Sequence, residues 1–335
     1  MREARREKLR ELLDRHGLGA LIQRRPANFA WYTGGADNRV DHADALGVAA
    51  ILLTPDAEYV LTDNIEAPRM CEEELPGFEV VDYPWYGEPL ESIRETIGGV
   101  PLGADHPLEG ARDLSEEITP MRYVLDEDAI ERCREVGKDA VAAMEEAAMH
   151  LNTQMDEHEA AAMLAAACRK RGLFTPVLIV AGEKRIPSYR HPIPRGNPLE
   201  SRAMLAICAE RGGLYTNLTR TVHFAEPDQD LKSRQEACDA ILQRMREATV
   251  PGRKLSDAFE DCKKFYAEAG YPDEWQQHHQ GGLTGYASRE VIATPETHLE
   301  MSSGMAFAWN PSVTGAKSED TFIVTDSGHE TITVV

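Results

Sequence analysis

Short runs of apolar residues alternate with amphipathic stretches through the first third of the chain. Leu9, Leu12 and Leu13 recur at helical spacing and predict a helix over 3–16. The later apolar runs predict strands, and the stretches between them predict helices: strands 20–23, 47–53, 58–62 and 79–82, and helices 64–75 and 89–97. Such alternation is typical of an α/β domain, which we place at residues 1–124.

From residue 125 onward the periodicity changes to longer helices. Acidic residues at 126–128 precede a long periodic stretch and suit the positive end of a helix over 127–150. The remaining elements are predicted as helices 155–172, 227–248 and 255–269, and strands 177–181, 203–209, 214–216, 221–224, 304–309 and 321–324. Strands flanked by two pairs of helices predict an α+β domain over 125–335.

The charge balance narrows the range of partners. There are 57 acidic and 36 basic residues, which gives a formal net charge of −21. Such a surface repels phosphates and anionic lipids, so nucleic acids and membranes are not expected as partners, and neutral, zwitterionic or cationic ligands are favoured. The six cysteines are scattered, and no apolar run resembles a signal peptide or a membrane span. We therefore expect a cytoplasmic protein with reduced thiols.

Polar and charged residues gather in four blocks of the last third. The blocks are 213–221 (GLYTNLTRT), 278–282 (HHQGG), 309–311 (WNP) and 317–321 (KSEDT). Their order and separation resemble the C-terminal domain of the creatinase, aminopeptidase P and methionine aminopeptidase superfamily, which has the pita-bread fold. Segment 28–34 (NFAWYTG) resembles the start of the creatinase-type N-terminal domain. The resemblance covers nearly the whole chain and implies a homodimer.

The resemblance also implies where a metal site would lie. In metal-dependent relatives, two Asp, one His and two Glu hold a pair of divalent ions that activate a water molecule. The corresponding positions here are Ala206, Asn217, one of His278 or His279, Asn310 and Glu319. Alanine has no ligand atom and asparagine brings no charge, so the remaining His and Glu cannot neutralise two dications. We therefore predict no metal and no cofactor.

Creatinase itself is a metal-free precedent in this superfamily. It hydrolyses a C–N bond of a small guanidino compound, with a histidine as general acid and base. His278, followed by Gly281 and by an Arg-Glu pair at 289–290, resembles the creatinase block and is favoured as the catalytic histidine. The peptidase-like register fits His279 with Gly282 as well, so the choice between the two histidines stays open.

Two further residues complete the predicted catalytic set. His191 precedes a proline in a segment that resembles the one presenting a second active-site histidine, which binds the substrate carbonyl or stabilises an oxyanion. Glu319 is predicted to hold a cationic part of the substrate or to orient a histidine. The predicted catalytic residues are His278, His191 and Glu319.

Other residues are predicted to bind the substrate: Asn217, Asn310, His279, Tyr286, Arg39, Glu290, Trp309 and Lys317. The two asparagine amides can hold an uncharged or zwitterionic group where metals would sit. Arg39 is expected to clamp a substrate carboxylate from the partner's N-terminal domain, and Lys317 to pair with Glu319 or with such a carboxylate. Tyr286 and Trp309 either wall a small pocket or belong to the core.

We therefore predict a metal-independent hydrolase that acts on a C–N bond of a small nitrogenous or peptide-like substrate. The alternatives are an Xaa-Pro peptidase that retains one metal, a lyase acting on a small zwitterion, and a non-catalytic binding protein. The retained His191, His278 and Glu319 favour an enzyme. The loss of charged metal ligands favours the non-catalytic binding protein.

Overall fold

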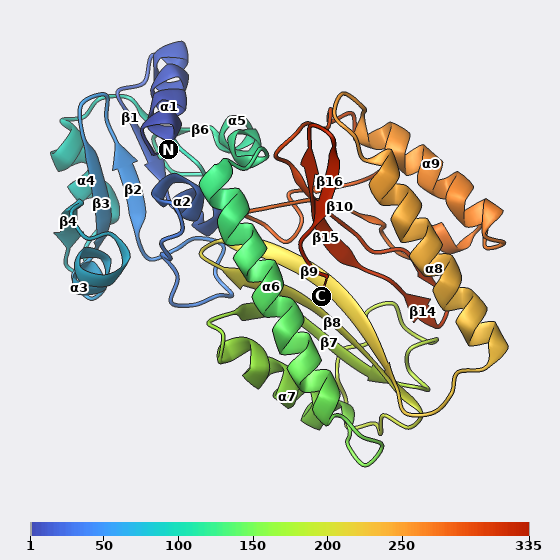
Figure 1. Ribbon diagram of the computed structural model, residues 1–335. Coiled ribbons are helices and arrows are strands. Elements are labelled where there is room, and N and C mark those ends of the chain that lie inside the picture. The colour runs from blue at the N-terminus through green and yellow to red at the C-terminus, as the bar shows by residue number, and fades with distance from the viewer. Residues whose placement is uncertain (1, 335) are drawn as a thin grey trace. The chain divides into compact units, whose positions relative to one another are not determined.

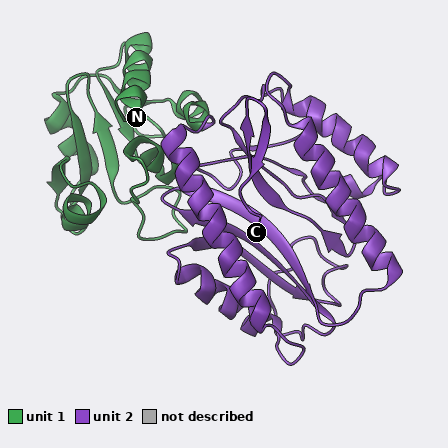
Figure 2. Cartoon of the chain, viewed as in Figure 1, with its two compact units in different colours: residues 1–122 green, residues 123–335 purple. Residues whose placement is uncertain are grey.

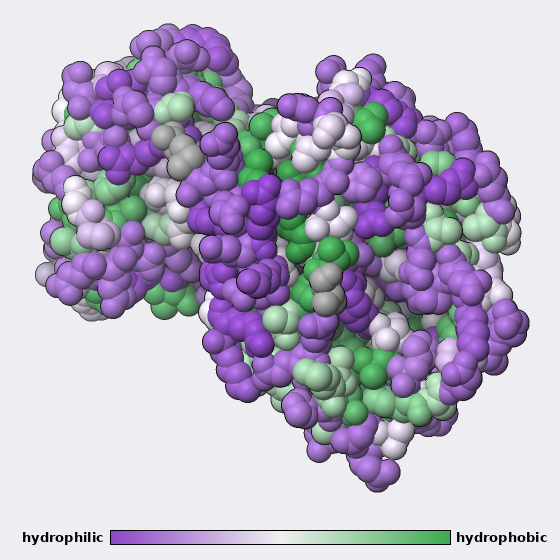
Figure 3. All heavy atoms as spheres, viewed as in Figure 1, coloured by the Kyte–Doolittle hydropathy of each residue, from purple (hydrophilic) through white to green (hydrophobic). Residues whose placement is uncertain are grey.

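The computed structural model describes residues 2–334, and the chain divides into two compact units, Met1–Arg122 and Tyr123–Val335 (Figure 2). This division falls just ahead of the boundary expected from the sequence. On the face shown in Figure 3, hydrophilic residues predominate and hydrophobic ones form smaller groups between them. Among the described residues, no helix has both the length and the apolar character that crossing a bilayer requires.

The first unit is built on one mixed sheet with strand order β4-β3-β2-β1-β5-β6 (Figure 1). Its strands are β1 (Ala20–Gln23), β2 (Ala50–Leu53), β3 (Glu58–Asp63), β4 (Glu79–Tyr83), β5 (Leu102–Ala104) and β6 (Ala111–Asp113). Its helices are α1 (Arg2–His16), α2 (Pro26–Thr33), α3 (Ala67–Arg69), α4 (Pro89–Ile97) and α5 (Ser115–Ile118). Strand β1 pairs antiparallel with β2 and parallel with β5, and Ile22, Leu52 and Leu61 are buried in the core of this unit.

The second unit contains two antiparallel sheets and two pairs of helices (Figure 1). One sheet has the order β7-β8-β9, with β7 (Phe174–Gly182), β8 (Arg202–Arg211) and β9 (Leu214–His223), and helices α6 (Glu127–His150) and α7 (Glu157–Arg169) cover it. The other has the order β11-β10-β12-β15-β16, with β10 (Gly281–Thr284), β11 (Val291–Ile292), β12 (Ala306–Trp309), β15 (Asp320–Thr325) and β16 (Gly328–Thr331). Helices α8 (Gln229–Ala248) and α9 (Leu255–Glu268) pack on this second sheet. A short hairpin of β13 (Ser312–Val313) and β14 (Ala316–Lys317) lies between β12 and β15 in the chain.

Local sequence signals explain the starts of the long helices. The Asp126 side chain accepts a hydrogen bond from the backbone N–H of Ala129, and Asp228 caps α8 in the same way. Asp156 and Glu159 form a reciprocal capping box at the start of α7. These caps satisfy N–H groups that have no partner inside the helix, so the helix boundaries were predictable to within a few residues.

Two predicted elements differ in the structure. The segments 214–216 and 221–224 are not two strands, because β9 runs unbroken over ten residues from Leu214 to His223. Asn217 and Thr219, in the middle of the strand, are buried and bonded to Thr321 and Glu319, so polarity there does not mark a turn. The predicted helix 64–75 consists of the short α3 and a π-helical turn over Met70–Glu74.

Glycines bring β10 close to both of its neighbours. Gly281 has φ +102°, and a Cβ there would lie 2.0 Å from the carbonyl oxygen of Ala308 on β12. Gly282 has φ +150°, and a Cβ there would lie 2.1 Å from the carbonyl oxygen of Val291 on β11. Only glycine fits these two positions. They fix the place of β10, the strand that follows the His278-His279 pair.

Candidate active site

The site is built where β9 meets the start of β15. The backbone N–H of Thr219 donates to the carbonyl of Glu319 at 3.2 Å, as an isolated bridge between the two strands. Next to this bridge, Thr321 Oγ1 accepts from the Asn217 N–H at 2.7 Å and donates to the Asn217 carbonyl at 2.9 Å. These bonds join the two sheets and fix both Asn217 and Glu319.

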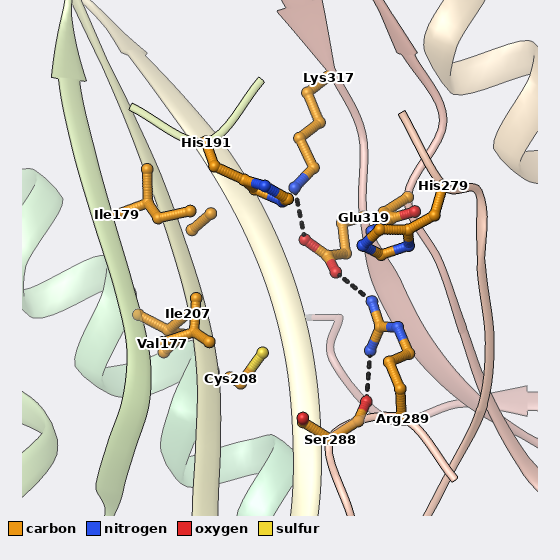
Figure 4. Close-up of a pocket in the computed structure, with 12 residues that line it drawn as sticks. Val177, Ile179, His191, Ile207, Cys208, His279, Ser288, Arg289, Lys317 and Glu319 are labelled. Atoms are coloured by element: carbon orange, nitrogen blue, oxygen red, sulfur yellow. Dashed lines mark hydrogen bonds and ion pairs between the residues drawn. The ribbon is translucent and has the colours of Figure 1, made fainter. Parts of the chain in front are cut away.

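Glu319 is buried and is held by two cations. Its carboxylate lies 3.1 Å from Lys317 Nζ and 2.9 Å from Arg289 Nη2, and it accepts a hydrogen bond of 2.7 Å from Thr219 Oγ1. Burial by itself raises the pKa of Glu319, but the charges of Lys317 and Arg289 outweigh it and lower that pKa to about 2. Figure 4 shows the two cations reaching the carboxylate from opposite sides. Lys317 and Arg289 therefore already contact the carboxylate that was predicted to hold a cationic substrate group or to orient a histidine.

The three predicted histidines lie together. Nε2 of His278 is 2.9 Å from Nε2 of His191, and the rings of His278 and His279 stack with centroids 4.4 Å apart. Burial, and then the Lys317 charge, lower the pKa of His278 to about 2. Burial, and then the Arg289 charge, lower the pKa of His279 to about 4. Burial also lowers the pKa of His191, so all three imidazoles are neutral at neutral pH.

These groups surround a cavity of about 190 Å³ in the second unit (Figure 4). Its polar wall contains His191, His279, Ser288, Arg289, Asn310, Lys317 and Glu319. Its opposite wall comes from β7 and β8 and consists of Val177, Ile179, Ala206, Ile207 and Cys208. The cavity therefore pairs neutral imidazoles and charged groups on one side with an apolar surface on the other.

His279 rather than His278 faces this cavity. His278 is buried behind it, with Nε2 held by His191, whereas His279 is half-buried and lines the wall. The buried Nδ1 atoms of both residues have no hydrogen-bond partner among the described residues. The geometry favours the register that aligns His279, which the sequence had left as the second choice.

The two asparagines retain free acceptors. Asn217 Nδ2 donates to Thr284 Oγ1 at 3.3 Å, and its Oδ1 has no hydrogen-bond partner among the described residues. The buried Oδ1 of Asn310 has none among them either, and Asn310 lines the cavity. A buried amide oxygen without a partner is costly, so a ligand donor at this position would be favourable.

Several predicted substrate-binding residues lie elsewhere. Trp309 is fully buried in the core of α8, α9 and the second sheet, and its indole N–H donates to Thr249 Oγ1, so of its two predicted places the structure has the core. Tyr286 is also buried, and its hydroxyl accepts from Arg132 at 3.0 Å. Glu290 is half-buried and does not line the cavity. Arg39 belongs to the first unit, where it pairs with Asp37 at 2.8 Å.

Arg289 is a member of the site that the sequence pattern did not single out. Arg289 was noted only as part of an Arg-Glu motif, yet it is the arginine that holds Glu319. The two residues are 30 positions apart, so no local spacing signal connects them. The apolar wall was missed as well, because Val177, Ile179 and Ile207 read as ordinary strand residues.

The donor set does not fit a pair of divalent ions. Ala206 supplies no ligand atom, and Asn217 and Asn310 supply only neutral oxygens. Glu319, the remaining carboxylate, is already paired with Lys317 and Arg289, and further cations would be repelled by those two groups. The histidines could hold a single ion, because ring nitrogens of His191, His278 and His279 lie within 4.8 Å of one another.

Comparisons with known proteins agree with the architecture. The model of metallopeptidase family M24 matches residues 131–326, and that of the creatinase/prolidase N-terminal domain matches residues 5–136. An uncharacterized peptidase of Staphylococcus aureus (strain MRSA252) is 24% identical over 345 residues, which cover 92% of this chain and 92% of that protein.

Solved structures show the same fold. The prolidase of Pyrococcus horikoshii OT3 has a TM-score of 0.84 at 18% identity, covering 99% of this chain and 98% of that one. The Xaa-Pro dipeptidase of Bacillus anthracis has a TM-score of 0.83 at 19% identity, covering 100% of this chain and 98% of that one. The predicted resemblance to the superfamily and the predicted fold class, an α/β domain followed by a pita-bread domain, are confirmed.

Proposed function

This chain belongs to metallopeptidase family M24, a family of hydrolases, and from that premise we propose that it hydrolyses a C–N bond without a metal. The proposed substrate is a small nitrogenous compound or a peptide-like amide. Histidine supplies the acid–base chemistry, and the cations on Glu319 supply the positive charge. The observation that carries the proposal is the pairing of the buried Glu319 carboxylate with Lys317 and Arg289 beside neutral histidines.

His279 is the group proposed to move the proton. It lines the cavity and is neutral at neutral pH, with a pKa of about 4. A water oxygen attacks the carbonyl carbon while His279 takes the water proton, and the carbonyl electrons move to the oxygen. The negative charge that develops nearby raises the pKa of the imidazole as the proton arrives. The imidazolium then donates that proton to the nitrogen as the C–N bond breaks.

The other residues are proposed to stabilise the oxyanion, to bind the substrate and to position His191. Lys317 Nζ is proposed to stabilise the oxyanion, because an ammonium group offers three donors and only one is committed to Glu319. Asn310 Oδ1 can accept a hydrogen bond from the substrate N–H. His278 holds His191 through their 2.9 Å contact and is therefore a positioning residue in this scheme.

One observation favours a second candidate, a peptidase with a single metal ion. The nitrogens of His191, His278 and His279 lie close enough to share one ion, which would supply an activated water molecule. Against this candidate, Lys317 and Arg289 already depress the pKa values of these histidines, and the same charges would repel a dication.

We also propose that the protein acts as a cytoplasmic homodimer on small or short peptide-like substrates. The superfamily resemblance supports the dimer, and the acidic composition supports partners other than nucleic acid. In a dimer, Arg39 would be the candidate to clamp a substrate group in the partner's site. Sedimentation at equilibrium tests the dimer, and a raised KM in Arg39→Ala without a change in kcat tests the clamp.

A substrate screen in the presence of a chelator tests the function. Protein purified with EDTA is assayed for amine release from N-acyl amino acids, short peptides and small amides. Turnover that survives EDTA and is lost in His279→Ala is the expected result. Turnover that needs added Mn²⁺ or Zn²⁺ would support the single-metal candidate instead. Tight binding without any turnover would point to a binding protein.

A further inference from the structure

A second cavity lies wholly within the first unit. Its volume is about 210 Å³, and its lining residues fall between positions 22 and 108. Helix α4 packs against β3 and β4 (Figure 1). The cavity lies beside this helix, over the face of the sheet that carries Ile22 on β1 and Ala50 on β2. None of these residues takes part in the chemistry proposed for the second unit.

Most of the cavity wall is aliphatic. The aliphatic side chains that line it are Ile22, Val48, Ala50, Leu61, Leu90, Ile93 and Leu108. Val48, Leu90 and Leu108 are only half-buried, so a ligand that covered them would remove apolar surface from water. A cavity of about 150 Å³ holds a benzene molecule, so about 210 Å³ suits a ligand of about nine non-hydrogen atoms.

Four polar side chains interrupt this wall: Arg24, Tyr83, Glu88 and His106. Arg24 donates from Nε to the carbonyl of Gly47 at 2.7 Å, and neither of its terminal nitrogens bonds to a described residue. Glu88 is exposed, and within the described chain its carboxylate has no ion pair and no hydrogen bond. Two opposite charges therefore line one cavity without contacting each other.

His106 is buried, at 4% exposure, and is held by Asp105. Its Nδ1 lies 2.9 Å from Oδ1 of Asp105, which is fully buried and also accepts from the backbone N–H groups of Arg24 and Arg25. An ionised carboxylate can only accept, so Nδ1 carries the hydrogen and the neutral ring keeps a lone pair on Nε2. No described residue bonds to Nε2. A buried acceptor without a partner is costly, so a ligand donor in the cavity would be favourable.

Tyr83 adds a hydroxyl group near the Arg24 guanidinium. Burial raises the pKa of Tyr83, and the charge of Arg24 partly offsets that rise, which places the two groups near each other. The hydroxyl has no hydrogen-bond partner among the described residues. Arg24 and Tyr83 thus offer donors to an anion, whereas Glu88 and His106 offer acceptors to a cation.

We propose that this cavity binds a free α-amino acid with an aliphatic side chain of about the size of leucine. The carboxylate accepts from the terminal nitrogens of Arg24 and from the Tyr83 hydroxyl. The ammonium group donates to Glu88 and to His106 Nε2, and the side chain packs on the aliphatic wall. A simple acid would leave both acceptors unused, and a simple amine would leave Arg24 unused. The site is independent of the hydrolysis proposed for the second unit.

Four ligands that contain no hydrolysable bond test the proposal. L-leucine, 4-methylpentanoate, isopentylamine and glycine are titrated into the full-length protein by calorimetry at neutral pH and constant ionic strength. The last three lack, in turn, the ammonium group, the carboxylate and the apolar side chain. Leucine is expected to bind at least about tenfold more tightly than each of them, because charge-assisted hydrogen bonds and apolar burial both contribute. Equal binding of leucine and any one of the three would overturn the proposal.

Variants assign each group of the ligand to its partner. Arg24→Met is expected to weaken leucine binding by about tenfold and to leave isopentylamine binding unchanged. Glu88→Gln is expected to weaken leucine binding and to leave 4-methylpentanoate binding unchanged. The control is Arg94→Met, which changes an exposed arginine of α4 that does not line the cavity, and it should bind leucine as the native protein does. Leu90→Trp should abolish binding, because the larger side chain fills the cavity.

If Arg24→Met fails to fold, Glu88→Gln decides, because Glu88 is exposed and makes no bond that the fold needs. Unchanged leucine binding in Glu88→Gln and Leu90→Trp would overturn the proposal.

Hydrogen exchange with and without leucine shows which unit binds the ligand. Slower exchange is expected in α4 and in residues 105–110. Protection confined to β7 and β8 would place leucine in the cavity of the second unit and would overturn the proposal. Neither measurement requires turnover, so a failure of hydrolysis would leave this result standing.

Discussion

His278 and His191 lie 87 positions apart in the sequence, and their Nε2 atoms approach to 2.9 Å. One Nε2 must carry the hydrogen and the other must accept it, so both rings cannot be doubly protonated while this contact lasts. Burial lowers both pKa values and keeps the pair neutral. The contact holds His191 at the cavity, which the neighbouring His279 also lines.

The first prediction separates the two adjacent histidines. His279→Ala should lower kcat by roughly 10²–10⁴-fold, the usual contribution of a general acid or base. His278→Ala should cost much less in kcat and should instead raise KM, because it releases His191 without removing the proton carrier. Steady-state kinetics on any amide substrate found by screening measure both values. A larger kcat loss in His278→Ala would restore the register that the sequence favoured.

The second prediction concerns stability at acid pH. The pKa values of His278 and His279 in the folded protein, about 2 and about 4, lie below the ordinary 6.5. The unfolded chain therefore binds more protons than the folded one below about pH 6.5, and stability falls as the pH drops from there toward 4. Urea unfolding across this range should show that decline. His278→Gln should flatten it, whereas the exposed His298→Gln should leave it unchanged.

The third prediction is the metal content. Protein purified without chelators should contain less than stoichiometric Mn, Co, Zn or Fe, because Ala206 supplies no ligand and Glu319 is committed to protein cations. Elemental analysis measures this directly. Two equivalents per chain would contradict the metal-free site. One equivalent that disappears in His191→Ala would assign the ion to the histidine cluster.

The fold was predictable where local chemistry determines it. The Asp126 cap and the acidic first turn located α6, and the apolar spacing of Leu9, Leu12 and Leu13 located α1. Strand β9 was divided in error because the neighbours that bury its polar residues, such as Thr321 beside Asn217, are 104 positions away. Local patterns do not contain that information.

The same difference between local patterns and long-range contacts decides which site residues could be predicted. The histidines and Glu319 were predictable from ordered motifs, since each block has a characteristic sequence. The partner of Glu319 was not, because Arg289 reaches it only through the folding of the sheet. Trp309 was equally undecidable, since an aromatic beside a polar motif suits a pocket wall as well as a core, and only packing against Phe307 assigns it.

The last prediction is that Asn217→Asp combined with Asn310→Glu will not create a metallopeptidase. Both positions are buried, at 0% and 2% exposure, so two new carboxylates there would lose hydration and have raised pKa values. Lys317 lies beside the site and would pair with new negative charge before any metal did. Ala206 would still supply no ligand atom. Metal ligands also need neighbouring groups that orient them by hydrogen bonds, and a chain without a metal site is not expected to keep such groups.

We therefore expect the double variant to melt at a lower temperature than the native protein and to gain little from Mn²⁺. Thermal melts with and without Mn²⁺, followed by an Xaa-Pro dipeptide assay, measure both effects. Adding Ala206→Asp and Lys317→Met to the double variant is the matched comparison, because it supplies the missing ligand and removes the competing cation. If metal-dependent cleavage appears in that fourfold variant alone, the missing ligand at Ala206 and the lysine on Glu319 together are the barrier to metal binding. Cleavage by the double variant would show instead that the metal site needs only its two lost charges.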